Sequence, residues 1–125
     1  MNILLIDDDA LVTRSVSQFL EDAGHKVAIA KDGSEADDYI DNVKTPPELI
    51  ICDLLMPGIS GLTFISLLRN FHNSSIPVIV ISSLNKAELL PLYAGITDLD
   101  FLPKPIDPDT LIEKVNKYNL KTVQL

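Results

Sequence analysis

Short runs of consecutive apolar residues alternate along this chain with longer stretches in which apolar residues recur every three or four positions. Residues 3–6, 49–52 and 78–81 are apolar at every position and include β-branched side chains, which is typical of strands buried on both faces. Residues 27–30 form a weaker candidate strand, and residues 100–102 form the weakest one. The pattern therefore predicts five short strands.

Helical periodicity fills the stretches between and after these runs. Apolar stripes at helical spacing occur in residues 11–20, 36–43, 62–68 and 111–115, and each stripe predicts a helix with one buried face. Asp9 can cap the first helix, and Gly24 can end it. The stretch 85–94 is different, because Pro91 lies inside it and should kink or shorten any helix there.

The predicted order is a strand followed by a helix, repeated five times. This order requires a parallel sheet covered by helices on both sides, which makes the chain an α/β protein. We expect a single domain over residues 1–125, with a core at about 2–118 and a short tail at 119–125. In open sheets of this class, ligands bind beyond the carboxyl ends of the strands.

Complementary polar groups stand at four of these strand ends. Asp7 and Asp8 follow the first strand, Asp53 follows the third, Ser82 follows the fourth, and Lys104 follows the fifth. Carboxylates crowded on one rim repel each other unless a cation intervenes, and oxygen ligands of this kind suit Mg²⁺. Together with an ammonium and a hydroxyl, such a site is suited to phosphoryl oxygens, and one carboxylate can act as a nucleophile.

At this point the chain resembles a known family. The segment Leu5-Ile6-Asp7-Asp8-Asp9, the segment Asp53-x-x-Met56-Pro57-x-x-x-Gly61 and the pair Lys104-Pro105 are together similar to the response-regulator receiver domain of bacterial two-component systems. The resemblance extends from Asn2 to about Tyr118. It implies a flavodoxin-like fold with strand order 2-1-3-4-5.

The resemblance also implies roles for the acidic residues. Asp53 would accept a phosphoryl group from a histidine kinase or a phosphotransfer protein. Asp8 and Asp53 would ligate Mg²⁺ directly, together with the main-chain carbonyl of Leu55, and Asp7 would act through a bound water. The domain would assist its own phosphorylation and dephosphorylation, and it would not be an enzyme that turns over a metabolite.

The same resemblance implies how the signal leaves the domain. Ser82 and Lys104 would bind the phosphoryl group, and Phe101 occupies the position of the family's mobile aromatic switch. Ser82 would move inward on phosphorylation and Phe101 would follow it. The face made by the fourth helix, fifth strand and fifth helix would then bind a downstream protein or a second copy of the chain.

Two departures from the family concern the fourth helix. The family has a glycine-containing turn before the fifth strand, but Gly95 lies two residues too early and Thr97 occupies the glycine position. Pro91 adds to this departure, because it shortens the preceding helix. We therefore expect an irregular fourth helix.

Composition narrows the range of partners. The formal net charge of −8 disfavours direct binding of nucleic acid. No apolar run is long enough for a membrane span or a signal peptide, so we expect a cytoplasmic protein.

Cys52 is the single cysteine, which excludes an intrachain disulfide, and its apolar neighbours predict a buried thiol. We expect His25 and His72 to be solvated at loops or helix ends, and not to act as a phospho-histidine or a metal ligand.

Three alternative functions are compatible with an α/β fold that carries acids at its strand ends. A Mg²⁺-dependent phosphohydrolase with an aspartyl phosphate needs an acid two residues after the nucleophile, where this chain has Leu55. A nucleotide or flavin binder of the same fold is disfavoured, because neither glycine-rich phosphate-binding motif is present. An unphosphorylated scaffold would be expected to lack Asp53, Lys104 or the acid pair, and all of them are present.

Overall fold

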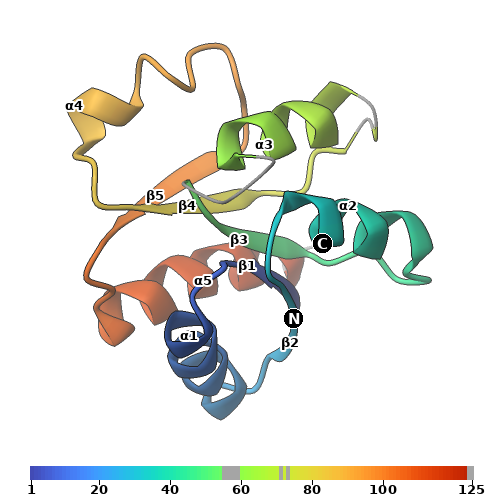
Figure 1. Ribbon diagram of the computed structural model, residues 1–125. Helices are drawn as coiled ribbons and strands as arrows, with labels where there is room; N and C mark the ends of the chain where they lie inside the picture. Colours follow the sequence, from blue (N-terminus) through green and yellow to red (C-terminus); the bar gives the residue numbers. More distant parts are fainter. Residues whose placement is uncertain (55–59, 71, 73, 124–125) are drawn as a thin grey trace.

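The computed structural model describes residues 1–54, 60–70, 72 and 74–123, and it contains a five-stranded sheet between two layers of helices (Figure 1). All neighbouring strands pair in parallel, in the order β2-β1-β3-β4-β5. The strands are β1 (Asn2–Ile6), β2 (Lys26–Ala30), β3 (Leu49–Asp53), β4 (Val78–Ser82) and β5 (Leu99–Pro103). The predicted flavodoxin-like fold and strand order are confirmed.

Helices cover both faces of the sheet, which explains why residues 3–6, 49–52 and 78–81 of the central strands are apolar at every position. The helices are α1 (Ala10–Asp22), α2 (Gly33–Asn42), α3 (Gly61–Asn70), α4 (Lys86–Leu89) and α5 (Pro108–Val123). In β3, Leu49 and Ile51 pack with α1 and α5, whereas Ile50 and Cys52 pack on the other side with α2 and α3. All four side chains are fully buried.

The ends of α1 follow the predicted signals. The carboxylate of Asp9 accepts hydrogen bonds from the backbone N–H groups of Leu11 and Val12, at 2.9 and 3.4 Å, as an N-cap does. Gly24 lies just beyond the helix with φ +95°, a conformation that L side chains rarely adopt. The first helix therefore starts immediately behind the acidic cluster.

The fourth helix is short, as Pro91 predicts. It ends at Leu89, and turns occupy the chain as far as Gly95. Gly95 has φ +82° and Asp98 has φ +59°, so the reversal before β5 uses these two residues. Thr97, which occupies the family's glycine position, is not in the left-handed region.

The last helix is long. It continues to Val123, so residues 119–123 of the predicted tail 119–125 are helical. No helix among the residues that the structure describes is both long enough and apolar enough to cross a membrane.

Candidate functional site at the carboxyl ends of the strands

Three carboxylates meet where β1 and β3 end. Asp7 follows β1, Asp8 comes next in the chain, and Asp53 is the last residue of β3. One oxygen of each can be chosen so that all three atoms lie within 4.8 Å of one another. Asp7 and Asp53 are buried, with 2% and 6% of their surface exposed, whereas Asp8 is exposed. The predicted convergence of the three acids is thus present.

The surroundings of Asp7 fit a bound cation. Its Oδ1 accepts a hydrogen bond from the backbone N–H of Asp9 at 2.9 Å, but its buried Oδ2 has no hydrogen-bond partner among the described residues. Burial raises the pKa of Asp7, and the negative charges of Asp53 and Asp8 raise it further, against the opposing effects of the Asp9 N–H and Lys104. A divalent cation would satisfy the unpaired oxygen and relieve this repulsion.

Lys104 brings a positive charge to the same rim. Its Nζ lies 3.3 Å from Oδ1 of Asp53, and the two side chains are 32% and 8% exposed. Lys104 directly follows β5, and its backbone N–H donates to the carbonyl of Ser82 at the end of β4, at 2.9 Å. The Lys104–Pro105 peptide bond is cis. An ammonium and a buried carboxylate are therefore held in contact, with one third of the lysine side chain open to solvent.

Ser82 and Phe101 lie on the neighbouring strands β4 and β5. Ser82 is buried, and its Oγ accepts a hydrogen bond from the backbone N–H of Leu84 at 2.9 Å. Phe101 is half-buried and stands beside Val80 in the strand register, two residues before the Ser82 position. Ser82 and Phe101 thus lie on adjacent strands, two register positions apart, as expected from the sequence.

Other predictions have mixed outcomes. Leu55, whose main-chain carbonyl is a predicted metal ligand, lies outside the described residues. Cys52 is buried as predicted, and burial raises the pKa of its thiol. The prediction of solvated histidines is wrong for His25, which is buried with Nδ1 3.0 Å from the amino group of Met1. It is also wrong for His72, whose ring is paired with two carboxylates.

Two residues near the site have roles that follow from the structure. Tyr93, which the sequence analysis did not single out, is buried and packs against Phe101. The one feature of the sequence that could have indicated this role is that Tyr93 is aromatic and lies two positions after Pro91. Gly61 begins α3, and a Cβ built on it would lie 2.6 Å from the backbone oxygen of Asp53. Only a glycine leaves space there for the end of β3 and the start of α3 to approach this closely.

Comparison with protein families matches residues 3–116 to the response regulator receiver domain. The chain therefore belongs to this family, and the resemblance seen in the sequence is confirmed. Receiver domains are the phosphorylation-controlled switches of two-component systems, not turnover enzymes. They bind Mg²⁺ at their acidic pocket and work with histidine kinases and downstream effectors.

Curated relatives are longer than this chain. Response regulator Rre1 of Synechocystis is 37% identical over 114 residues, which cover 89% of this chain and 48% of the relative. Response regulator RR06 of Streptococcus pneumoniae is 32% identical, over 92% of this chain and 51% of the relative. The chain thus spans about half the length of these proteins.

Two solved structures of similar size have the same fold. The receiver domain of the Francisella response regulator 1452 superposes with a TM-score of 0.85 at 30% identity, covering 97% of this chain and 98% of that one. The chemotaxis response regulator CheY4 of Vibrio cholerae gives a TM-score of 0.84 at 26% identity, covering 94% and 97%.

Proposed function

We propose that Asp53 accepts a phosphoryl group from a histidine kinase or a phosphotransfer protein in the cytoplasm. The observation that carries this proposal is the position of Asp53: its buried carboxylate is 3.3 Å from Lys104 and beside Asp7 and Asp8. In the transfer, a carboxylate oxygen of Asp53 attacks phosphorus, the phosphorus–nitrogen bond of the donor phosphohistidine breaks, and its electron pair returns to the imidazole. Lys104 holds the phosphoryl oxygens during this exchange.

Mg²⁺ is the cation that this oxygen-only donor set suits. Asp8, Asp53 and the main-chain carbonyl of Leu55 would hold it, and Asp7 would hold it through a water. The chemistry that Mg²⁺ would supply when bound is positive charge beside the phosphoryl oxygens. The unpaired Oδ2 of Asp7 would accept a hydrogen bond from that water and so orient it.

The switch would begin at Ser82. Its hydroxyl accepts a hydrogen bond from Leu84, and a phosphoryl group on Asp53 offers stronger acceptors that the hydroxyl can donate to. Movement of Ser82 toward Asp53 would open space for the half-buried Phe101. The face made by α4, β5 and α5 would then change its affinity for a downstream protein or for a second copy of the chain. With a net charge of −8, neither nucleic acid nor an anionic membrane surface is a suitable direct partner for this chain.

The test is incubation with acetyl phosphate and Mg²⁺, followed by intact mass measurement. We expect one added phosphoryl group in the wild type and in the matched control Asp38→Ala, which removes an exposed acid of α2. Asp53→Ala should take up none, and Lys104→Met should be labelled more slowly. Undiminished labelling of Asp53→Ala would show that another residue is the acceptor.

The metal ligands are tested by Mg²⁺ titration. Asp8→Ala should weaken Mg²⁺ binding at least tenfold, on the order of the loss typical for a ligand or its close support. Asp9→Ala is the control, because the Asp9 carboxylate is occupied in capping α1. Equal Mg²⁺ affinity of the wild type and Asp8→Ala would remove Asp8 from the site.

A further inference from the structure

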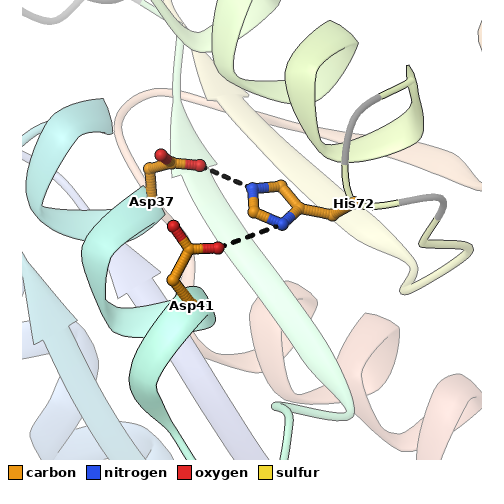
Figure 2. Close-up of side chains that lie close together, drawn as sticks. All are labelled: Asp37, Asp41 and His72. Atoms are coloured by element: carbon orange, nitrogen blue, oxygen red, sulfur yellow. Dashed lines mark hydrogen bonds and ion pairs between the residues drawn. The ribbon is translucent and has the colours of Figure 1, made fainter.

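A second group of metal-ligating side chains lies between α2 and the segment after α3 (Figure 2). Asp37 and Asp41 are four residues apart on α2, so their carboxylates share one face of the helix. Figure 2 shows the ring of His72 pointing between them. One ligand atom of each residue can be chosen so that all three lie within 4.8 Å of one another.

This group lies away from the receiver site. His72 lines a surface pocket together with residues that precede β3 and β4, among them Pro47 and Pro77. These residues mark the amino ends of the central strands, whereas Asp7, Asp53 and Lys104 gather at the carboxyl ends. Any ligand of His72 is therefore independent of the phosphoacceptor.

The two contacts of the His72 ring differ in length. Nε2 is 2.6 Å from Oδ1 of Asp37, a short hydrogen bond. Nδ1 is 3.4 Å from Oδ1 of Asp41, which is beyond the usual 2.7–3.2 Å of an N–H···O bond. A neutral imidazole carries one N–H. With that N–H on Nε2 and donated to Asp37 across the short contact, the lone pair of Nδ1 faces the carboxylate of Asp41.

That arrangement needs a positive charge, supplied either by a second ring proton or by a bound cation. A lone pair and a carboxylate oxygen repel each other, and the two carboxylates at i and i+4 do so as well. Within the described part of the chain, neither Asp37 nor Asp41 has an ion pair with a lysine or an arginine. A divalent ion between Nδ1 and Asp41 removes both repulsions.

The spacing fits a transition metal. Two ligands held by one tetrahedral Zn²⁺ at 2.0–2.2 Å lie about 3.4 Å apart, and this is the separation of Nδ1 and Oδ1 of Asp41. A metal-bound histidine usually donates its other N–H to a carboxylate, as Nε2 does to Asp37. The Asp41 side chain is 54% exposed, so water can complete the coordination.

We propose that His72 Nδ1 and Asp41 bind a divalent transition-metal ion of the Zn²⁺ type, with Asp37 as the positioning residue. An imidazole ligand selects Zn²⁺, Ni²⁺ or Cu²⁺ over Mg²⁺. The bound ion links α2 to the segment after α3 and stabilises their packing. The proposal rests on no property of the phosphoacceptor site.

Calorimetric titration with Zn²⁺ in excess Mg²⁺ tests the proposal. The titration is made on the wild type and on Asp8→Ala, whose receiver site is impaired, and we expect both proteins to bind one Zn²⁺ outside that site. His72→Gln and Asp41→Asn should lose this binding, and Asp37→Asn should weaken it by about tenfold. Asp38→Asn is the matched control, because it removes the same charge from the next position of the same helix, and it should bind like the wild type.

A second readout separates metal binding from simple ion pairing. In nitrogen-15 NMR spectra of the histidine rings, Zn²⁺ should shift Nδ1 of His72 and leave the rings of His25 unchanged. If no Zn²⁺ binding depends on His72 and Asp41, the three side chains form an ion pair only, and the proposal is wrong. Labelling of Asp53 by acetyl phosphate is measured in a separate experiment. Failure of the metal-site proposal can therefore be distinguished from failure of the proposed phosphorylation of Asp53.

Discussion

Tyr93 packs the edge of its ring against Phe101, with 5.6 Å between the ring centroids and 64° between their planes. Tyr93 belongs to the turns that follow the short α4, and Phe101 lies in β5. Tyr93 is 4% exposed, and its hydroxyl is buried without a hydrogen-bond partner among the described residues. Burial raises the pKa of this phenol. Phe101, the proposed switch residue, is therefore in contact with the irregular turns that follow α4.

Two substitutions of Tyr93 distinguish the contribution of its ring to stability from that of its hydroxyl. Tyr93→Phe keeps the ring pair and removes an unpaired buried polar group, so it should raise the free energy of unfolding by about 1 kcal/mol. Tyr93→Leu removes the aromatic pair and should lower it by about 1 kcal/mol. Urea unfolding measures both. A Phe variant less stable than the wild type would mean that the hydroxyl has a partner.

Gly61→Ala should damage both stability and phosphorylation. The added Cβ would lie 2.6 Å from the backbone oxygen of Asp53 and 3.0 Å from Cα of Leu54, so the strand end or α3 must shift. We expect a loss of about 1–3 kcal/mol and slower labelling by acetyl phosphate.

The control for Gly61 is Gly95→Ala. Gly95 has φ +82°, and an added Cβ would meet no atom within 4 Å. This variant should lose about 1 kcal/mol through backbone strain and be labelled at the wild-type rate. Normal labelling of Gly61→Ala would show that the close approach of α3 does not position Asp53.

Asp7→Asn should stabilise the protein in the absence of Mg²⁺. Because the pKa of Asp7 is raised above its ordinary value of 3.8, the folded state binds the proton more tightly than the unfolded state. Ionisation therefore costs stability as the pH rises from 3.8 through the folded pKa. The Asn variant should be more stable by about 1–3 kcal/mol at pH 7, and the gain should vanish at low pH.

Urea unfolding at both pH values checks this dependence on Asp7. Asp8→Asn is the comparison, because Asp8 is exposed and its charge costs less in water. A gain for Asp7→Asn that is unchanged at low pH would contradict ionisation as its cause.

Arg69 connects α3 to the loop before β5. Its guanidinium donates to the backbone carbonyls of Thr97 and Asp98 at 3.2 and 3.3 Å, and to that of Ser74 at 3.1 Å. Arg69→Ala should lower the free energy of unfolding by about 1–3 kcal/mol, since these charged hydrogen bonds are lost.

Arg69→Lys should recover only part of the loss, because an ammonium cannot reach three carbonyls in the fork geometry of a guanidinium. Hydrogen exchange of the amides around Asp98 should speed up in both variants. Unchanged exchange there would show that Arg69 does not hold the loop.

Much of the fold follows from local pattern. Runs that are apolar at every position predicted the buried strands, because only a strand covered on both faces tolerates them. Asp9 predicted the start of α1, because an N-cap bonds only to the first turn of its own helix. Pro91 predicted a shortened α4, because a proline lacks the backbone N–H that a helix needs. The acids and Lys104 could be placed on one rim because parallel strands bring their carboxyl ends together.

Other features depend on contacts between residues far apart in the chain. His72 was expected in solvent, but α2 places Asp37 and Asp41 beside it. Tyr93 contacts Phe101 because the folded chain places the turns after α4 against β5. The sequence by itself determined the order of the elements and the residues at the strand ends, since hydrophobic period and backbone preferences are local. Only the tertiary structure decided which side chains from different elements pair, because that depends on how the helices pack on the sheet.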